Sequence, residues 1–223
     1  MLAQHDGMSA RNATPTANLP TLGVVLAGGR ARRAGGGDKS RILVGGSSIL
    51  ERVISRIGTQ CAGLILNANG NAARFADTHL LVVPDSVPHY AGPLAGILAG
   101  LDWAAAHAPK TQWIVSVPSD CPFLPRNLVE RLHQARIEAA ADLACSESGG
   151  QRHPVIALWP VTLREDLRRA LTIEGIRKVD EWAARYRVGI ANWPREPVDP
   201  FFNVNTPDDT AAAERMAARH ADA

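Results

Sequence analysis

The sequence predicts an α/β fold: a three-layer, Rossmann-like architecture in which a mostly parallel sheet carries helices on both faces. The early strand candidates are continuous apolar runs, which is typical of strands buried on both faces of a sheet. These runs alternate with segments whose apolar residues recur at helical spacing, the pattern of successive strand and helix units. With 223 residues and a hydrophobic content of 46%, the chain can bury a core as a single domain.

The first half of the chain contains four strand candidates and two helix candidates. The strands are expected over residues 24–27, 63–67, 80–83 and 113–117. One helix is expected to follow Ser48, because Ser48 and Glu51 form a capping box ahead of apolar residues at helical spacing. A second is expected to begin at Pro93, since proline suits the first position of a helix and an apolar face follows it.

The second half continues the alternation. Helices are expected to open at Pro125 and, at the end of the chain, at Thr206 and Pro207. Further strands are expected around 143, over 155–158 and over 187–190, with helices over 163–171 and 175–184. Trp182 and Trp193 are expected in the core. Together these elements predict one domain over residues 21–223.

Composition limits where the chain works and what it binds. Residues 1–20 are polar, lack the apolar core of a secretory signal and are expected to be a disordered leader or a misassigned start. No apolar run has the length of a membrane span, so we expect a cytoplasmic protein without a membrane partner. A net charge of +2 gives no general attraction to nucleic acid. Cys61, Cys121 and Cys145 are spaced neither for a disulfide framework nor for zinc, and Cys121 is better explained as small apolar filler than as a reactive thiol.

The segment from Gly23 to Ser40 carries the strongest functional signal. It leaves the first strand as a loop rich in glycine and positive charge. Its glycines are Gly28, Gly29, Gly35, Gly36 and Gly37, and its cations are Arg30, Arg32, Arg33, Lys39 and Arg41. Bendable backbone with dense positive charge suits a polyphosphate and indicates a nucleoside triphosphate. Asp38 directly before Lys39 excludes a Walker A loop, and the dinucleotide fingerprint is absent. The alternative is a basic surface loop.

Polar residues follow the other strands, and ligands of such sheets lie beyond the carboxyl ends of the strands. Asp120 follows the fourth strand between two prolines, and we expect it to ligate Mg²⁺, which takes few carboxylates and keeps waters. The alternative is that Asp120 only caps a turn. Asp85 would contact a base or ribose, or start a turn. Asn67 would contact ligand hydroxyls, or cap its own strand. His153 would be a catalytic base, a contact to phosphate or to a second substrate, or a structural surface residue.

With these residues the chain closely resembles the molybdenum cofactor guanylyltransferases, which are glycosyltransferase-A-like nucleotidyltransferases with the fold of the nucleotide-diphospho-sugar transferases. The opening motif of that family, Leu-Ala-Gly-Gly-x-x-x-Arg-Met-Gly-Gly-x-Asp-Lys, is found from Leu26 to Lys39, with Ala34 in place of methionine. Further matches lie at residues 67–69, 84–85, 92–96, 120–122, 153–154 and 203–207. The resemblance covers nearly everything after the leader.

The resemblance implies a role for each matching residue. Leu26, Ala27, Gly28 and Gly29 would line the guanine nucleotide, Asn67 and Asp85 would contact the nucleoside, and Asp120 would bind the nucleotide and Mg²⁺. Lys39 and Arg33 would hold the phosphates and, with Asp120, form the catalytic set. His153, Asn203 and Asn205 would face the pterin.

The resemblance further implies transfer of GMP from GTP to molybdopterin, with release of pyrophosphate. GTP and molybdopterin would be the partners, with room for transient contact with molybdoenzyme chaperones or other cofactor-synthesis proteins. Gly28 would leave space for a purine edge, whereas related cytidylyl enzymes read Leu-Ala-Ala-Gly. The alternatives are a cytidylyltransferase for the same cofactor, a sugar-phosphate nucleotidyltransferase, and a non-catalytic GTP-binding carrier of the cofactor.

Overall fold

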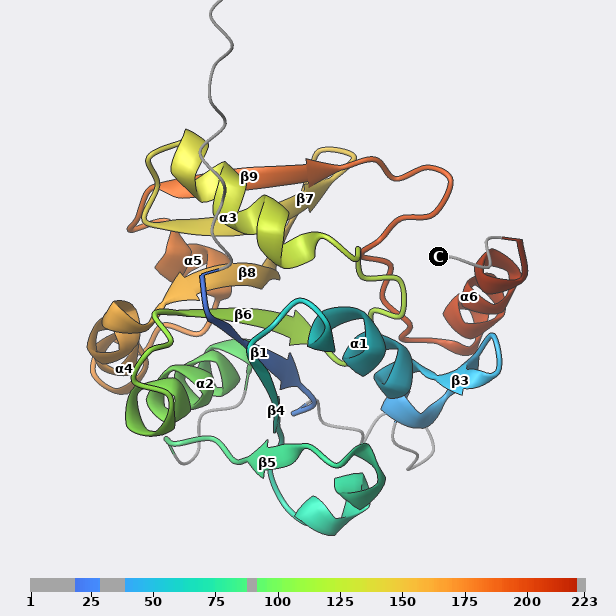
Figure 1. The fold of residues 1–223 in the computed structure, drawn as a ribbon, viewed down its shortest axis with the longest axis horizontal. Helices are drawn as coiled ribbons and strands as arrows, with labels where there is room; N and C mark the ends of the chain where they lie inside the picture. Colours follow the sequence, from blue (N-terminus) through green and yellow to red (C-terminus); the bar gives the residue numbers. More distant parts are fainter. Residues whose placement is uncertain (1–18, 29–38, 88–91, 220–223) are drawn as a thin grey trace, which may run out of the picture.

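The fold is built on a seven-stranded sheet, seen in a computed structural model that describes residues 19–28, 39–87 and 92–219 (Figure 1). The strands are β1 (Thr21–Leu26), β4 (Gly63–Asn67), β5 (Leu81–Val83), β6 (Trp113–Pro118), β7 (Leu143–Ser148), β8 (Gln151–Pro160) and β9 (Val188–Trp193). Their order is β5-β4-β1-β6-β8-β7-β9, and β8 alone runs against its neighbours. The predicted mostly parallel sheet is confirmed.

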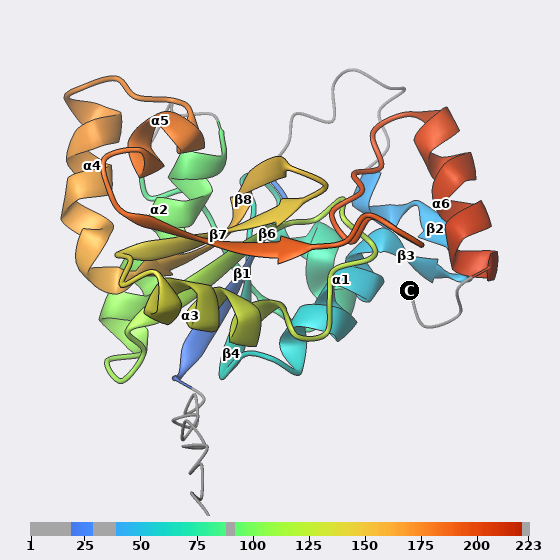
Figure 2. The same cartoon turned by 90° about the horizontal axis from the view of Figure 1, so that it is seen from above.

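Helices cover both faces of this sheet, which gives the three predicted layers (Figure 2). They are α1 (Ile49–Gly58), α2 (Pro93–His107), α3 (Leu128–Glu138), α4 (Arg164–Thr172), α5 (Val179–Ala183) and α6 (Pro207–Arg219). Each face has its own apolar core, because successive side chains of a strand point to opposite sides. Val25 packs with residues of α1 and α3, whereas Val24 packs with residues of α2, α4 and α5. Trp182 and Trp193 are buried, as expected.

Short elements complete the described chain. They are η2 (Lys39–Arg41), β2 (Leu43–Val44), β3 (Ser47–Ser48), η3 (Ala72–Thr78) and η4 (Val161–Leu163). The β2–β3 hairpin lies against the C-terminal helix, since Gly45 N donates to Glu214 Oε2 on α6 at 3.2 Å. No helix within the described ranges is both long and apolar enough to span a bilayer.

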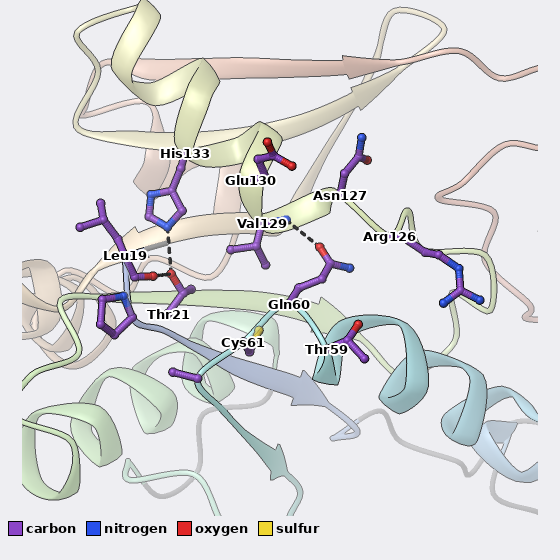
Figure 3. Close-up of a pocket in the computed structure, with 12 residues that line it drawn as sticks. Leu19, Thr21, Thr59, Gln60, Cys61, Arg126, Asn127, Val129, Glu130 and His133 are labelled. Atoms are coloured by element: carbon purple, nitrogen blue, oxygen red, sulfur yellow. Dashed lines mark hydrogen bonds between the residues drawn. The ribbon is translucent and has the colours of Figure 1, made fainter. Parts of the chain in front are cut away.

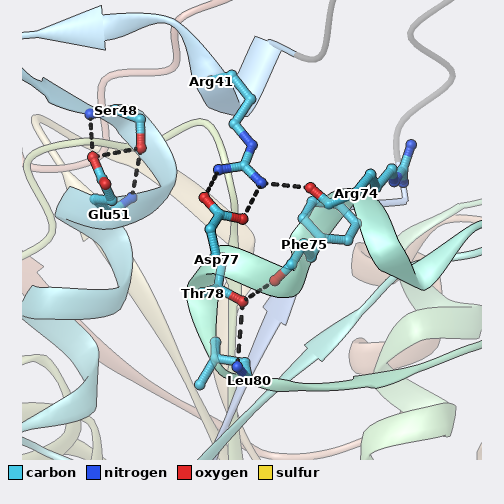
Figure 4. Close-up of polar contacts among 8 residues, drawn as sticks. All are labelled: Arg41, Ser48, Glu51, Arg74, Phe75, Asp77, Thr78 and Leu80. Atoms are coloured by element: carbon cyan, nitrogen blue, oxygen red, sulfur yellow. Dashed lines mark hydrogen bonds and ion pairs between the residues drawn. The ribbon is translucent and has the colours of Figure 1, made fainter.

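The capping box predicted at the start of α1 is confirmed (Figure 4). The Ser48 amide donates to Glu51 Oε2 at 2.7 Å, and the Glu51 amide donates to Ser48 Oγ at 3.2 Å. These two bonds satisfy backbone donors that the first helical turn leaves open. The bonds that the Ser48 amide and the Ser48 hydroxyl donate to Glu51 Oε2 hold the pKa of the Glu51 carboxyl below its usual value.

Replacing Ser48 with alanine should lower the free energy of unfolding by about 1 kcal/mol, because the side-chain oxygen that caps α1 is lost. The comparison variant is Ser47→Ala, at an exposed position of the same hairpin, with an expected change within about 0.5 kcal/mol. Urea denaturation of both variants tests this. Equal effects would show that the capping bonds add nothing to stability.

Two helix boundaries predicted from the sequence are wrong. The helix expected from Pro125 begins at Leu128, because the Pro125 carbonyl accepts from Gln60 Nε2 at 2.8 Å and residues 126–127 form a turn. The helix expected over 175–184 is the shorter α5. Gly175 has a φ of +74°, a left-handed conformation that ends the preceding helix before α5 can begin.

Candidate functional site

The carboxyl ends of β1, β4 and β6 lie side by side, as the parallel sheet requires. Leu26, the last residue of β1, pairs with Asn67 of β4 and with Pro118 of β6. Beyond the strands the Ala27 amide donates to the Asn67 carbonyl at 2.9 Å, and the Ser119 amide donates to the Leu26 carbonyl at 3.1 Å. The loops that follow these three strands therefore start from one place, as predicted.

The side chains of Asn67 and Asp85, which were predicted as nucleoside contacts, are joined by a hydrogen bond. Asn67 is buried, and its Nδ2 donates to Asp85 Oδ1 at 3.0 Å and to the Val83 carbonyl at 3.1 Å. Asn69 Nδ2 donates to Asp85 Oδ2 at 2.7 Å, and the Asp85 amide donates back to Asn69 Oδ1 at 2.9 Å. The Asp85 carboxylate is thus held by two amides. Asn69 was not among the predicted site residues, although the Asn-x-Asn pattern was visible.

Gly96 of α2 is a second residue that sequence reasoning did not single out. A β carbon there would lie 2.3 Å from Asn67 Oδ1 and 2.7 Å from Leu26 Cδ2. A β carbon at Gly28 would lie 3.8 Å from Asn67 Oδ1, an ordinary contact. Asn67 can therefore take its position because Gly96 has no side chain. At this point α2 approaches β1 and β4 too closely for any other residue.

The loop after β6 brings Asp120 beside the segment of Asn203. The half-buried Asp120 accepts from the Val204 amide through its carbonyl at 3.0 Å. Between them lies the thiol of Cys121, fully buried, 2.6 Å from Asn203 Oδ1 and 3.9 Å from Asp120 Oδ1. Burial and the Asp120 charge raise the pKa of the Cys121 thiol well above its usual value, so it is a neutral donor rather than a nucleophile.

Asn203 and Asn205, which were expected to face the pterin, lie on the connection between β9 and α6. Asn203 contacts the loop after β6 through Cys121. Asn205 has an exposed side chain, and its amide donates to Asp209 Oδ2 at 3.0 Å at the start of α6. The placement follows from a long connection after β9, which returns across the carboxyl ends of the strands.

Two side-chain oxygens, from Asp120 and Asn203, lie near the Cys121 thiol. The Asp120 carboxylate and the Asn203 amide oxygen flank one thiol, and Mg²⁺ prefers such hard oxygen ligands with waters completing its shell. This donor set fits the predicted Mg²⁺. Within residues 19–28, 39–87 and 92–219, no three His, Cys, Asp or Glu side chains gather as a metal cluster.

His153, near the start of β8, is held by two side chains. Its Nε2 lies 2.9 Å from Ser148 Oγ, and that hydroxyl donates to Asp199 Oδ1 at 2.9 Å. The imidazole ring also packs on Phe201, with 4.8 Å between ring centroids. Burial lowers the pKa of His153, so that the ring is neutral near neutral pH. The same chain segment that carries Phe201 leads on to Asn203, which links His153 to the Asp120 loop.

The cationic loop itself is described only at its ends. Gly29 and Arg33 lie outside the described residues, and for Lys39 the backbone alone is described, as the first residue of η2. Arg41, counted among the loop cations, contacts Asp77 and donates to the Arg74 carbonyl at 2.5 Å (Figure 4). Asp77 therefore balances the charge of Arg41. Residues 1–18 also lie outside the described ranges, so the division into leader and domain stays a prediction.

A pocket of about 370 Å³ lies at the opposite edge of the sheet, around the amino ends of β1 and β4 (Figure 3). Thr21 Oγ1 donates to the Leu19 carbonyl at 2.9 Å and therefore accepts from His133 Nε2, which is 2.8 Å away. Burial, with a smaller effect of the Arg136 charge, lowers the pKa of His133 from 6.5 to about 4. The pocket is separate from the residues predicted to bind nucleotide.

We expect His133 to make the fold sensitive to acid. The unfolded chain takes up a proton near pH 6.5 and the folded chain only near pH 4, so the free energy of unfolding falls as the pH drops through this window. In His133→Phe that part of the pH dependence should disappear. The matched control is His107→Gln, at an exposed histidine of α2, which should keep the wild-type profile. Urea denaturation at several pH values tests this. If the free energy of unfolding of His133→Phe changed with pH as steeply as that of the wild type, the assignment would be contradicted.

Comparison with known proteins identifies the family. Residues 23–188 match the family described as MobA-like NTP transferase domain. A molybdenum cofactor guanylyltransferase from Nitrobacter hamburgensis is 61% identical over 199 residues, covering 89% of this chain and 95% of that protein. Another from Rhodopseudomonas palustris (strain HaA2) is 59% identical over 199 residues, covering 89% of this chain and 93% of that protein.

Solved structures support the fold. The molybdopterin-guanine dinucleotide biosynthesis protein A of Archaeoglobus fulgidus matches with a TM-score of 0.69 at 24% identity, over 89% of this chain and 100% of that one. A 4-diphosphocytidyl-2C-methyl-D-erythritol synthase from Anaerococcus prevotii matches with a TM-score of 0.68 at 13% identity, over 91% of this chain and 97% of that one. A Mycobacterium tuberculosis protein in complex with manganese matches with a TM-score of 0.63 at 20% identity, over 88% of this chain and 98% of that one.

These solved structures show the fold, which is the predicted nucleotide-diphospho-sugar transferase type. The family match spans well over half of the chain, and the curated relatives are similar along nearly their whole length. The chain therefore belongs to the MobA-like NTP transferases and, among them, to the molybdenum cofactor guanylyltransferase family, whose members are nucleotidyltransferases.

Proposed function

We propose that this chain transfers GMP from GTP to molybdopterin, forming the guanine dinucleotide cofactor and releasing pyrophosphate. The observation that supports this most is the meeting of three loops at one sheet edge: the motif that begins at Leu26, the bonded Asn67–Asp85 pair, and the loop of Asp120. The names of the curated relatives point to the same transfer.

In this proposal GTP lies across the carboxyl ends of β1 and β4. The backbone of residues 26–29 would line the guanine, with Gly28 leaving room for a purine edge. Asn67 and Asp85 would contact the nucleoside. Because Asn67 and Asn69 already hold the Asp85 carboxylate, its orientation is set before the nucleotide arrives, which lowers the entropy cost of binding.

The phosphates would extend toward Asp120. Its carboxylate, with Asn203 Oδ1 nearby, would hold Mg²⁺, which neutralises charge on the phosphate oxygens when bound. Lys39 and Arg33 would hold the triphosphate in line with the attacking group. An oxygen of the molybdopterin phosphate forms a bond to the α-phosphorus, and the bond to the bridging oxygen of the leaving pyrophosphate breaks.

This attacking oxygen is already anionic at neutral pH, so the transfer needs no strong general base. Positioning and charge neutralisation then account for the rate enhancement. The second substrate would lie on the side of His153, Asn203 and Asn205. The bond from His153 to Ser148 and the contact of Asn203 with the Asp120 loop place these two residues at the same sheet edge.

The function is tested by incubating the protein with molybdopterin, Mg²⁺ and GTP, CTP or ATP, with products identified by mass spectrometry. We expect the guanine dinucleotide as the product. The kcat/KM for GTP should exceed the values for CTP and ATP by on the order of 10²-fold or more, because polar groups placed for guanine stay unpaired against other bases. A preference for CTP would indicate the cytidylyltransferase. Tight GTP binding without any product would indicate the carrier.

Lys39→Ala should weaken GTP binding by about 10-fold or more while leaving the affinity for guanosine within about 2-fold, because the ammonium group pairs with phosphate. The matched control is Arg41→Ala, a nearby cation whose charge is balanced by Asp77, with a smaller expected effect on GTP. Titration calorimetry with both ligands measures this. Equal losses for GTP and guanosine would remove Lys39 from the phosphate site.

A further inference from the structure

A chain of hydrogen bonds joins three side chains at the carboxyl-end edge of the sheet. Ser148, the last residue of β7, is fully buried, and its Oγ lies 2.9 Å from both Asp199 Oδ1 and His153 Nε2. Asp199 comes from the segment after β9, and His153 stands on β8, across the β7–β8 turn. Side chains from β7, from β8 and from the segment after β9 thus form one hydrogen-bonded series that ends at the imidazole ring.

The acceptor oxygen of Asp199 determines where the protons lie. Arg195 Nε is 3.0 Å from Asp199 Oδ2, and the Arg195 stem lies over Gly149, where a β carbon would fall 2.1 Å from Arg195 Cδ. A carboxylate paired with arginine is ionised and can only accept. The Ser148 hydroxyl therefore donates to Asp199, and its oxygen accepts from His153. Nε2 of His153 must carry a proton.

The other ring nitrogen, Nδ1, then bears the lone pair. Across the residues that the structure describes, Nδ1 has no hydrogen-bond partner. The charged groups that act on the ring are Asp199, Arg195 and Glu147, and burial outweighs them, lowering the pKa of His153. Near neutral pH, Nδ1 is therefore an acceptor, which cannot bond to a fully ionised phosphate oxygen.

The residues around His153 connect it to the loop of Asp120. The His153 ring packs against Phe201, and the Phe201 carbonyl lies 3.8 Å from the Cys121 thiol, next to Asp120. The segment that carries Asp199 and Phe201 thus runs from the histidine to the loop proposed to hold Mg²⁺. A group bound against His153 would lie along this segment.

We propose that Ser148 and Asp199 are positioning residues, which hold His153 as its Nε2–H tautomer so that Nδ1 accepts a hydrogen bond from the second substrate. The identity of that substrate rests on the proposed function. The heterocycle of a pterin carries N–H and amino donors, whereas its phosphate offers acceptors. In this proposal His153 recognises the heterocycle rather than the phosphate.

The tautomer is tested by long-range ¹H–¹⁵N NMR of the imidazole rings in the free full-length protein, assigned with His153→Gln. We expect a protonated Nε2 and an unprotonated Nδ1 in the wild type, and loss of this single tautomer in Ser148→Ala. Asp199→Asn is the matched control: it keeps the acceptor oxygen and removes the charge, so the tautomer should stay while the pKa of His153 falls further. An Nδ1–H tautomer in the wild type would overturn the proposal.

Steady-state kinetics test whether His153 contributes to binding of molybdopterin. Ser148→Ala should raise KM for molybdopterin about 10-fold, the cost of one misplaced hydrogen bond, and change KM for GTP less than about 2-fold. Equal changes in both KM values would assign Ser148 a merely structural role and overturn the proposal. The wild-type spectrum decides the tautomer even if Ser148→Ala does not fold. Absence of GMP transfer would refute the proposed function and leave the NMR result standing.

Discussion

Asp120→Asn should reduce GMP transfer by on the order of 10²-fold or more, the largest effect that we expect of any single substitution in this chain. The change removes one negative charge and keeps the shape, so Mg²⁺ loses the one carboxylate proposed to hold it next to the transferred phosphate. The fold should survive, because Asp120 bonds Val204 through its backbone carbonyl, which the substitution leaves in place.

Initial rates at saturating GTP and Mg²⁺ measure the effect, and thermal unfolding shows that the variant is folded. The matched control is the same chemical change at Asp208, an exposed carboxylate in the first turn of α6, for which we expect wild-type rates. If Asp120→Asn retained activity within about threefold of the wild type, the proposed metal ligand would be wrong.

Gly96→Ala should impair both stability and GTP binding. The new methyl group would fall 2.3 Å from Asn67 Oδ1, and Asn67 cannot retreat easily because it is buried and bonded to Val83 and Asp85. Overpacking of this kind costs about 1–3 kcal/mol of stability. Displacement of Asn67 also releases Asp85, so we expect the Kd for GTP to rise by about 10-fold or more, the loss of at least one hydrogen bond to a charged group.

The same helix offers the control for this variant. Gly100→Ala, one turn further along α2, would bring a β carbon to 2.6 Å from Val24 Cγ2 and 3.2 Å from Ile114 Cδ1. Asn67 is not among the nearest neighbours of this β carbon. It should destabilise the protein to a similar degree, while its folded form binds GTP like the wild type. Urea denaturation and titration calorimetry separate the two effects. Equal GTP affinities in the two variants would disprove the role of Gly96.

Much of the fold was predictable because its signals are local. The strands at 63–67 and 113–117 are apolar runs bounded by polar or turn residues, and β4 and β6 are found there. The capping box of Ser48 and Glu51 depends on residues three positions apart, and it is present. The rule that ligands lie beyond the carboxyl ends of parallel strands was enough to bring Leu26, Asn67 and Asp120 into one candidate site.

The sequence by itself therefore determined the fold class, the family resemblance and most of the candidate site residues, since each rests on short-range patterns or on loops that follow strands. Only the tertiary structure decided the reversed direction of β8, the late start of α3 against Gln60, and the contact of Asn203 with Cys121. It alone revealed the close approach of Gly96 to Asn67 and the bonds from Asp199 through Ser148 to His153. Except for Ser148 and His153, which face each other across the β7–β8 turn, these pairs lie far apart in the chain, and their contact depends on how whole elements pack, which no local pattern of residues encodes.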